Sequence, residues 1–294
     1  MSKATFLPYI EVLFAVIVWG ASFIATKIAL ETISPISIVW LRFAMGVVVL
    51  GMIVALRKQF ALPERREWGY FALLGFLGIT FHQWLQSNGL QTSEAGTTAW
   101  IVATTPVFMA LLGWIFLREG LAVTQIIGIG LAAAGVLLVT TDGNIASISI
   151  GRFGAPGDIL ILVSAVNWAV VSALSRRGLK LYAAGLMTFY IMTFGWLFSS
   201  LLFFGGRHYT EIGHLSLNGW LGVTFLGIFC SGLAYIAWYD ALQALSTAET
   251  GVFLYIEPLV AVVVAFFLLD EAITWASLIG GAIILFGVWM VNRN

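Results

Sequence analysis

The sequence predicts an all-α integral membrane protein with ten transmembrane helices, arranged as two inverted-topology repeats of five helices. Three observations lead to this fold class: an unusually apolar composition, ten apolar runs of helical length, and an internal repeat. Of the 294 residues, 61% are hydrophobic and only 10% are charged, and the mean hydropathy is +1.00. A soluble domain carries about 25% charged residues. The chain therefore lacks the polar surface that solubility in water requires.

Ten runs are long enough to cross a membrane, because a helix that rises roughly 1.5 Å per residue needs about 20 residues to span a hydrocarbon layer roughly 30 Å thick. They cover residues 8–30, 34–56, 68–90, 95–117, 122–141, 156–176, 183–205, 217–240, 247–269 and 273–291. Strands of a membrane barrel would alternate in polarity over about ten residues. These runs are continuously apolar, so helices are expected. The first run exceeds the apolar core of a cleaved signal peptide and is expected to stay as a membrane helix.

The segments between the runs are too short to fold as soluble domains. No G-x-x-x-x-G-K-[ST] phosphate-binding sequence occurs, and we expect no cofactor. The 14 basic and 14 acidic residues balance to a net charge of zero, which argues against nucleic acid as a partner. The single cysteine, Cys230, cannot form an intramolecular disulfide.

The distribution of Lys and Arg predicts the orientation. With ten spans, both termini lie on one side of the membrane, and that side carries ten basic residues: Lys3, Arg57, Lys58, Arg65, Arg66, Arg118, Arg176, Arg177, Lys180 and Arg293. The opposite side carries Lys27, Arg152 and Arg207, while Arg42 lies within a span. Because positive charge is retained on the cytoplasmic face, both termini are expected in the cytoplasm and the protein in the cell (inner) membrane.

An internal repeat divides the chain into residues 1–144 and 145–294. Seven features recur at two constant offsets. At 152 residues these are Leu90-Gln91 and Leu242-Gln243, Pro106 and Pro258, Glu119 and Glu271, Gly128 and Gly280, and Gly135 and Gly287; at 149 residues they are Phe76-Leu77-Gly78-Ile79 and Phe225-Leu226-Gly227-Ile228, with Trp19 and Trp168. Five spans per repeat is an odd number, so the second repeat must be inverted. Inverted repeats are typical of secondary transporters, whose sites lie where the repeats meet near mid-membrane.

The repeated prolines, Pro106 and Pro258, lie near the middle of their spans and predict helix kinks. Proline removes a backbone donor and frees carbonyl groups at bilayer depth. Free carbonyls are tolerated where they face protein or a water-filled cavity. A kink that is merely packed against other helices remains the alternative.

Aromatic and uncharged polar side chains form the candidate binding site. Trp19, Trp100 and Trp168 lie well inside their spans, away from the interfaces that Trp usually occupies. They suit a substrate with an apolar or aromatic side chain, and simple packing is the alternative for each. The other candidates are His82 and Gln86, which share a face of one span, Tyr235 and Tyr239, which share a face of another, and Asn167, which is adjacent to Trp168.

Ionisable residues at bilayer depth are functional candidates because burying them is unfavourable. Glu257 lies mid-span beside Pro258 and is the strongest: it could meet a substrate amine or carry a coupling proton. His82 could relay protons, or be a hydrogen-bonded interior side chain. Arg42 is interpreted as structural rather than as a substrate ligand. One outer loop holds His208, Glu211 and His214, a combination that could bind a metal ion at the surface. We assign no metal site and no catalytic residue.

Several segments resemble the EamA-type proteins of the drug/metabolite transporter superfamily. They are Trp19-Gly20-Ala21-Ser22-Phe23 with Lys27, Pro35 with Leu41-Arg42-Phe43, and Pro106 with Glu119, Gly128 and Gly135; the second half matches with Glu257-Pro258, Glu271, Gly280 and Gly287. The family usually has Gly before the repeated Glu, where this chain has Arg118 and Asp270. The resemblance implies ten helices in two inverted bundles around a central cavity. Overall the chain is most similar to YddG-type amino-acid exporters, although no single motif carries that narrower likeness.

The leading functional hypothesis is a secondary transporter that exports aromatic and other neutral amino acids by alternating access. A multidrug or other small-metabolite exporter of the same superfamily is the alternative, and a passive channel is a more distant one. A membrane-embedded enzyme is not expected, since no nucleophile with its base is apparent. The expected partners are a small-molecule substrate and the lipid bilayer. The glycine pairs 128/135 and 280/287 predict close helix packing within the chain or a homodimer contact.

Overall fold

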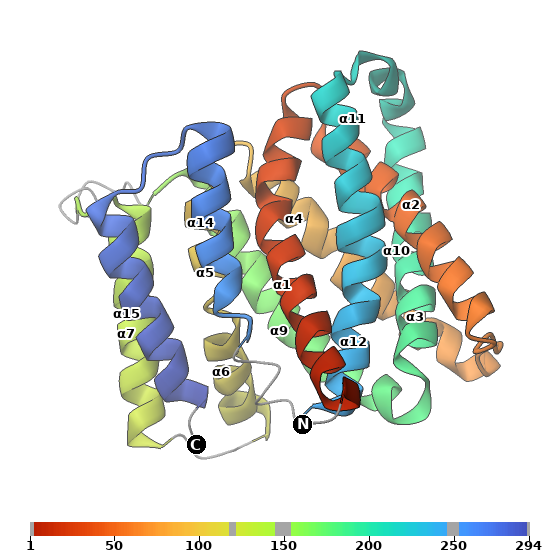
Figure 1. Cartoon of the computed structure of the whole chain (residues 1–294), viewed down its shortest axis with the longest axis horizontal. Coiled ribbons are helices and arrows are strands. Elements are labelled where there is room, and N and C mark those ends of the chain that lie inside the picture. The colour runs from red at the N-terminus through yellow and green to blue at the C-terminus, as the bar shows by residue number, and fades with distance from the viewer. Residues whose placement is uncertain (1–2, 118–121, 145–153, 246–252, 293–294) are drawn as a thin grey trace.

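The computed structural model describes residues 3–117, 122–144, 154–245 and 253–292, and every regular element in these ranges is helical (Figure 1). The elements are α1 (Lys3–Leu30), α2 (Pro35–Leu56), η1 (Arg65–Glu67), α3 (Trp68–Gly75), η2 (Phe76–Phe81), α4 (His82–Gly89), α5 (Ala95–Val102), α6 (Thr105–Leu117), α7 (Val123–Thr140), α9 (Pro156–Leu181), α10 (Ala184–Gly205), η3 (His208–His214), α11 (Leu217–Thr224), η4 (Phe225–Leu233), α12 (Ala234–Ala244), α14 (Ile256–Leu269) and α15 (Trp275–Asn292).

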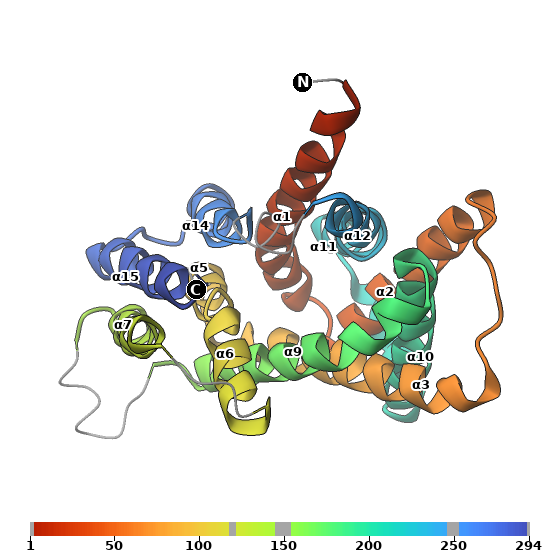
Figure 2. The ribbon, with the colours of Figure 1, turned by 90° about the horizontal axis from the view of Figure 1, so that it is seen from below.

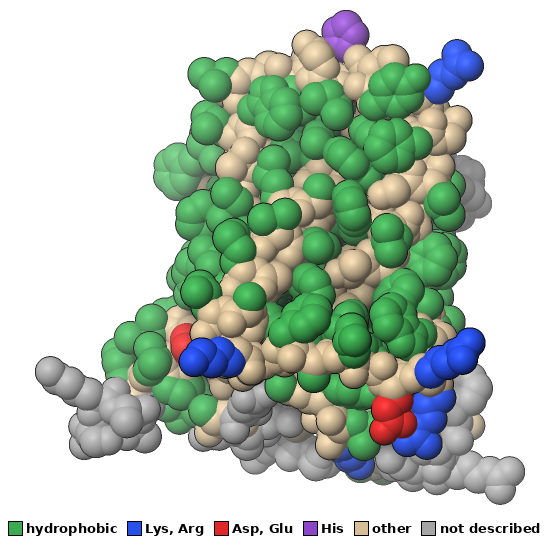
Figure 3. Space-filling model, turned by 90° about the vertical axis from the view of Figure 1, so that its right-hand side faces the viewer, with side chains coloured by type: hydrophobic (Ala, Val, Ile, Leu, Met, Phe, Trp, Pro, Cys, Tyr) green, Lys and Arg blue, Asp and Glu red, His purple; other side chains and the backbone are tan. Residues whose placement is uncertain are grey.

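Eight helices within the described ranges are long and apolar enough to cross a membrane, and they coincide with eight of the ten expected spans. Residues 68–89 are helical throughout, but their second half is the polar helix α4, and they are not among the eight. The ninth expected span is described only from residue 253, and its helix α14 has 14 residues. Figure 3 shows a broad apolar band between an upper and a lower charged edge, as a multi-pass membrane protein requires.

Helix boundaries recur at the same offsets as the sequence repeat. Shifting α2 by 149 residues gives the bounds of α10, and shifting α3 by 149 gives those of α11. Shifting α7 by 152 residues gives the bounds of α15. The repeated Phe-Leu-Gly-Ile segment is π-helical in both halves, as η2 and η4. Equivalent stretches of the two halves therefore adopt the same local structure.

The packing partners also correspond between the halves. Helix α1 packs against α14 and against η4 and α12, while its equivalent α9 packs against α5 and α6 and against α4. Each of these two helices thus contacts the equivalent elements of the opposite half. Helices α7 and α15 form a pair at one end of the molecule, apart from the central helices (Figures 1 and 2).

Glycines bring α7 and α15 into close contact. A Cβ atom at Gly128 would lie 2.6 Å from the carbonyl oxygen of Gly287, and one at Gly135 would lie 2.7 Å from that of Gly280. The reverse contacts, from Gly287 to Gly128 and from Gly280 to Gly135, are 2.6 and 2.9 Å. Because the lower residue number of one helix meets the higher number of the other, the two helices are antiparallel. The glycine faces serve packing within the chain.

Both repeated prolines lie in the first turn of a helix, after a break. Helix α5 ends at Val102 and α6 begins at Thr105, so Pro106 is its second residue. Residues 254–255 form the equivalent turn, and Pro258 is the third residue of α14. Proline is tolerated there because the first amides of a helix have no intrahelical acceptor. The fourth expected span thus contains a two-residue turn, residues 103–104, just before Pro106.

The carboxylate of Glu211, in η3, stabilises the start of α2. Its Oε2 accepts hydrogen bonds from the Ser34 amide and the Ser37 hydroxyl, both at 2.8 Å, and its Oε1 lies 2.6 Å from His208 Nδ1. Burial by itself raises the pKa of Glu211, but the hydrogen bonds from His208, Ser34 and Ser37 outweigh it and lower the pKa to about 2. Among the described residues, no three or more His, Cys, Asp or Glu side chains are grouped so that they could hold a metal ion, and this includes His208, Glu211 and His214.

The low pKa of Glu211 predicts a pH-dependent contribution to stability. Its ordinary pKa of 4.5 applies in the unfolded chain, so the stabilisation is complete above pH 4.5 and is lost as the pH falls toward 2. Glu211→Gln should lower the unfolding temperature by about 2–4 °C per kcal/mol lost at pH 7. The difference from wild type should shrink as the pH falls from 4.5 to 3, measured by thermal unfolding in detergent. Glu31→Gln, at the exposed end of α1, is the control; an equal, pH-independent effect of Glu211→Gln would contradict this assignment.

Candidate functional site

One group of aromatic side chains joins α1 to α12. The Trp19 ring lies 5.4 Å from Tyr235 in an edge-on arrangement and 5.4 Å from Trp238, and Tyr235 lies 6.5 Å from Tyr239. Trp19 Nε1 donates a hydrogen bond to the carbonyl oxygen of Cys230 at 3.1 Å. Cys230 is in the π-helix η4, a rare element that is frequently found at functional sites. Trp19, Tyr235 and Tyr239 are thus brought together, as the site hypothesis requires.

A second group joins α4 to α9. The rings of His82 and Trp168 lie 4.9 Å apart at an angle of 33°, and His82 Nδ1 lies 3.2 Å from the carbonyl oxygen of Ser164. Asn167 donates to the carbonyl oxygen of Leu77, in the π-helix η2, at 2.9 Å. A donor on α9 thus satisfies a carbonyl of η2 much as Trp19 on α1 satisfies one of η4. The half-buried Gln86 lies one turn beyond His82 on α4.

Arg42 lies between the two groups and is only 5% exposed. Its Nε donates to Ser231 Oγ at 3.1 Å and its Nη1 to Gln83 Oε1 at 3.0 Å. It is also close enough to His82 and Tyr235 to interact with both electrostatically. Sequence reasoning assigned Arg42 a structural role, because its position in a span does not show where the guanidinium lies. The structure places it in contact with both halves of the chain, which no sequence signal indicated.

Glu257 approaches the first group from α14. A Cβ atom at Gly20 would lie 2.6 Å from the Glu257 carbonyl oxygen, so α1 and α14 are in close contact beside Trp19. The Glu257 carboxylate interacts electrostatically with Cys230 and Tyr235, and the side chain is half-buried. The ion pairs found among the described residues do not include it. Its carboxylate is therefore available to a ligand amine or a proton.

Trp100 lies apart from these residues. It is 2% exposed, donates through Nε1 to Ser277 Oγ at 3.1 Å, and packs against α7 and α15. A Cβ atom at Gly281 would collide with its ring. The structure thus places Trp100 in the contact between α5 and α15, which favours the packing alternative for this residue.

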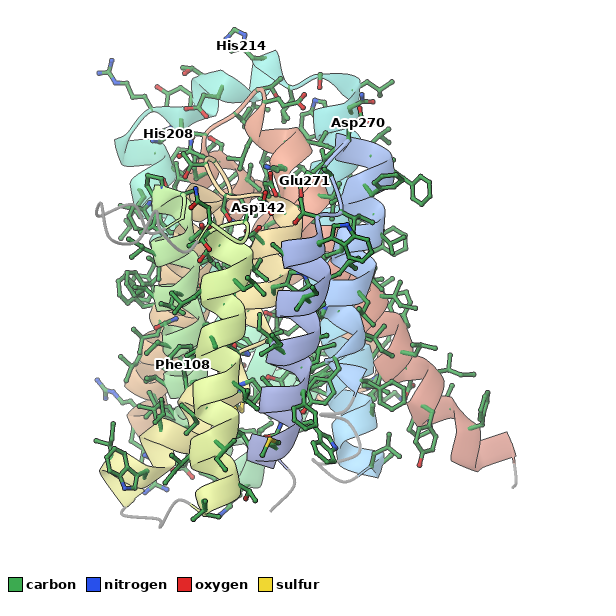
Figure 4. All side chains as sticks on the ribbon, turned by 90° about the vertical axis from the view of Figure 1, so that its left-hand side faces the viewer. Phe108, Asp142, His208, His214, Asp270 and Glu271 are labelled. Carbon is green, nitrogen blue, oxygen red and sulfur yellow. The ribbon has the colours of Figure 1, made fainter. Side chains whose placement is uncertain are left out.

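A cavity of about 380 Å³ lies near the start of α5, the end of α7 and the start of α15, and Figure 4 shows two of its lining residues, Asp142 and Glu271, at that end of the helices. It is lined by neither aromatic group. Glu271 Oε1 pairs with Lys27 at 2.9 Å and accepts from the Ala95 amide at 2.8 Å, while Oε2 accepts from the Gly96 amide at 3.1 Å. One carboxylate thus neutralises Lys27 and caps α5, which ties α1 and α5 to the segment before α15.

The fold and these contacts define a multi-pass helical membrane protein whose interior holds ionisable and aromatic side chains. The chain belongs to the EamA-like transporter family, whose profile matches residues 7–141 and 155–293. The family and the relatives of this chain are transporters rather than enzymes.

Several relatives match nearly the whole chain. An uncharacterized transporter of Archaeoglobus fulgidus is 28% identical over 95% of this chain and 94% of that protein. A probable terminal-alkyne amino-acid exporter of Streptantibioticus cattleyicolor is 28% identical over 95% and 91%, and the uncharacterized inner membrane transporter YedA of Escherichia coli is 28% identical over 97% and 91%. A solved crystal structure superposes with a TM-score of 0.65 over 99% of this chain and 96% of that one, at 20% identity, which shows a shared fold.

The ion pair between Lys27 and Glu271 should stabilise the protein measurably. Its side chains are 27% and 11% exposed, so a double-mutant cycle of Lys27→Met and Glu271→Gln should give a coupling free energy of about 1 kcal/mol. The surface pair Arg66 and Glu64, 77% and 66% exposed, is the control and should give a value near zero. Equal coupling in the two cycles, measured by denaturant unfolding, would show that burial adds nothing to the pair.

Proposed function

We propose that this chain exports aromatic and other neutral amino acids across the cytoplasmic membrane by alternating access. The observation that carries the proposal is the convergence of two aromatic groups, each built from both halves of the chain, around Arg42 and near Glu257. Neutral donors and rings suit the side chain of such a substrate, and the two opposite charges suit its zwitterionic head.

The proposed architecture is ten membrane-crossing helices in two inverted repeats, residues 1–144 and 145–294, around a central cavity. Three features support it: the recurrence of helix bounds at the repeat offsets, the exchanged packing partners of α1 and α9, and the antiparallel contact of α7 with α15. Figure 1 shows both chain ends at the same end of the bundle, which agrees with an even number of crossings. The excess of Lys and Arg supports placing that end in the cytoplasm.

In this proposal the substrate contacts the Trp19, Tyr235 and Tyr239 rings on one side and His82, Trp168 and their polar neighbours on the other. The breaks before Pro106 and Pro258 supply points at which α6 and α14 can move relative to the preceding segment. The name of the Streptantibioticus cattleyicolor relative, a probable exporter of a terminal-alkyne amino acid, supports amino acids as the substrate class.

Counterflow in proteoliposomes tests the proposed function. Vesicles preloaded with unlabelled phenylalanine should take up labelled phenylalanine in a saturable manner, because an alternating-access carrier exchanges substrate across the membrane. Trp19→Ala should reduce this exchange by about tenfold, since it removes the ring at the centre of the first aromatic group. Trp275→Ala, which changes a side chain that is 79% exposed, should leave the exchange unchanged.

Other outcomes would point to other functions. Exchange of amphipathic drugs but of no amino acid would favour a multidrug exporter of the same family. Flux that rises without saturation would indicate a channel. Absence of exchange across a broad panel of amino acids and drugs would contradict the proposal.

A further inference from the structure

Arg42 is a buried cation whose position calls for an anionic partner. It is 5% exposed and lies within α2, well inside the membrane-spanning part of the chain. Within the described ranges its hydrogen-bond partners are two neutral oxygens, Ser231 Oγ and Gln83 Oε1, and it takes part in no ion pair. An unpaired charge at this depth is strongly unfavourable, and ionisable residues there are kept for a function.

The two neutral partners fix the direction of the guanidinium. Ser231 is in η4 and Gln83 is in α4, so the group is held from both halves of the chain through Nε and Nη1. The remaining nitrogen, Nη2, has no hydrogen-bond partner among the residues described. The planar Arg42 guanidinium, with Nη2 free to donate, matches the geometry of a carboxylate, which accepts paired hydrogen bonds from Arg.

The surroundings of Arg42 have the polarity that an α-amino acid needs. Tyr235 and Cys230 interact electrostatically with Arg42 and also with Glu257, so the cation and the carboxylate approach the same two side chains. They form no ion pair with each other. The Trp19 ring contacts Tyr235, and the Trp168 ring contacts His82, which neighbours Gln83. Two separated opposite charges therefore lie among aromatic rings.

We propose that Arg42 binds the carboxylate of the transported substrate, while Glu257, which approaches the same two side chains, receives its ammonium group. This inference rests on the proposed function and makes it specific: the substrate is recognised as a zwitterion, and an analogue without either charge binds less well. Ser231 and Gln83 are positioning residues that hold the guanidinium toward the substrate.

Three ligands test the contributions of the substrate carboxylate and ammonium groups to binding separately. Phenylalanine carries both groups, phenethylamine lacks the carboxylate and 3-phenylpropionate lacks the amine. Purified full-length protein in nanodiscs should bind phenylalanine roughly tenfold or more tightly than either analogue, because each analogue leaves one buried charge unpaired. Binding is measured by calorimetry or by displacement of labelled phenylalanine.

Substitution of Arg42 should affect only ligands that carry a carboxylate. Arg42→Gln should weaken phenylalanine and 3-phenylpropionate by roughly tenfold or more and leave phenethylamine unchanged. Arg42→Lys, which keeps the charge but loses the fork, should retain part of the preference for phenylalanine over phenethylamine. Glu257→Gln should give the mirror result, weakening phenylalanine and phenethylamine but not 3-phenylpropionate. Arg66→Gln, on the surface, is the control for removal of an arginine.

Gln83→Glu tests the same point without removing the cation. A carboxylate at this position would lie about 3 Å from Nη1, form an ion pair with Arg42 and compete with the substrate carboxylate. This variant satisfies the buried charge and should fold even where Arg42→Gln does not. It should weaken phenylalanine and spare phenethylamine.

The outcomes distinguish this inference from the proposed function. If wild type binds and exchanges phenylalanine but Arg42→Gln and Gln83→Glu weaken phenylalanine and phenethylamine equally, or weaken neither, the assignment of Arg42 is wrong and the function stands. If wild type neither binds nor exchanges any of the common neutral amino acids, the proposed function fails and this inference fails with it.

Discussion

The absence of water in the hydrocarbon layer is the constraint on which this structure depends, because every backbone polar group at that depth needs a partner within the protein. Helices meet this need through their own backbone hydrogen bonds, and in the π-helices η2 and η4 side chains add to it. Trp19 donates to the Cys230 carbonyl and Asn167 to the Leu77 carbonyl, so side chains of α1 and α9 join the π-helices of the opposite half. Aromatic and amide side chains at bilayer depth therefore have a structural reason to lie where the candidate site is.

The same constraint separates two kinds of helix contact. Helices α7 and α15 pack through glycines at backbone distance and carry no candidate site residue. The contacts of α1 and α9 with their neighbours are made by larger aromatic and polar side chains. Close backbone packing suits a fixed pair of helices, whereas contacts through side chains leave room for rearrangement during a transport cycle.

Charged side chains also differ between the ends of the helices and the interior of the protein. At the ends they are neutralised locally: Lys27 pairs with Glu271, Arg57 pairs with Asp240, and Glu211 accepts several hydrogen bonds at the start of α2. In the interior, Arg42 and Glu257 have no such partner among the described residues. A ligand with one negative and one positive group would pair with both Arg42 and Glu257 and would therefore bind there in preference to water. Such a pair of charges allows the interior of a membrane protein to recognise a small zwitterion.

The sequence by itself determined the membrane class, the positions of most helices and the offsets of the repeat, because hydropathy and the spacing of Pro and Gly depend on local chemistry. It also indicated Trp19, Tyr235 and the pair His82 and Trp168, since mid-span polar or aromatic residues are unusual enough to be noticed. Only the tertiary structure decided where each side chain points. Trp100 and Trp168 looked equivalent in the sequence, yet one packs on Gly281 and the other on His82. The sequence could assign Arg42 only a structural role within its span, because the partners of a side chain at bilayer depth come from helices distant in the chain, here α4 and η4.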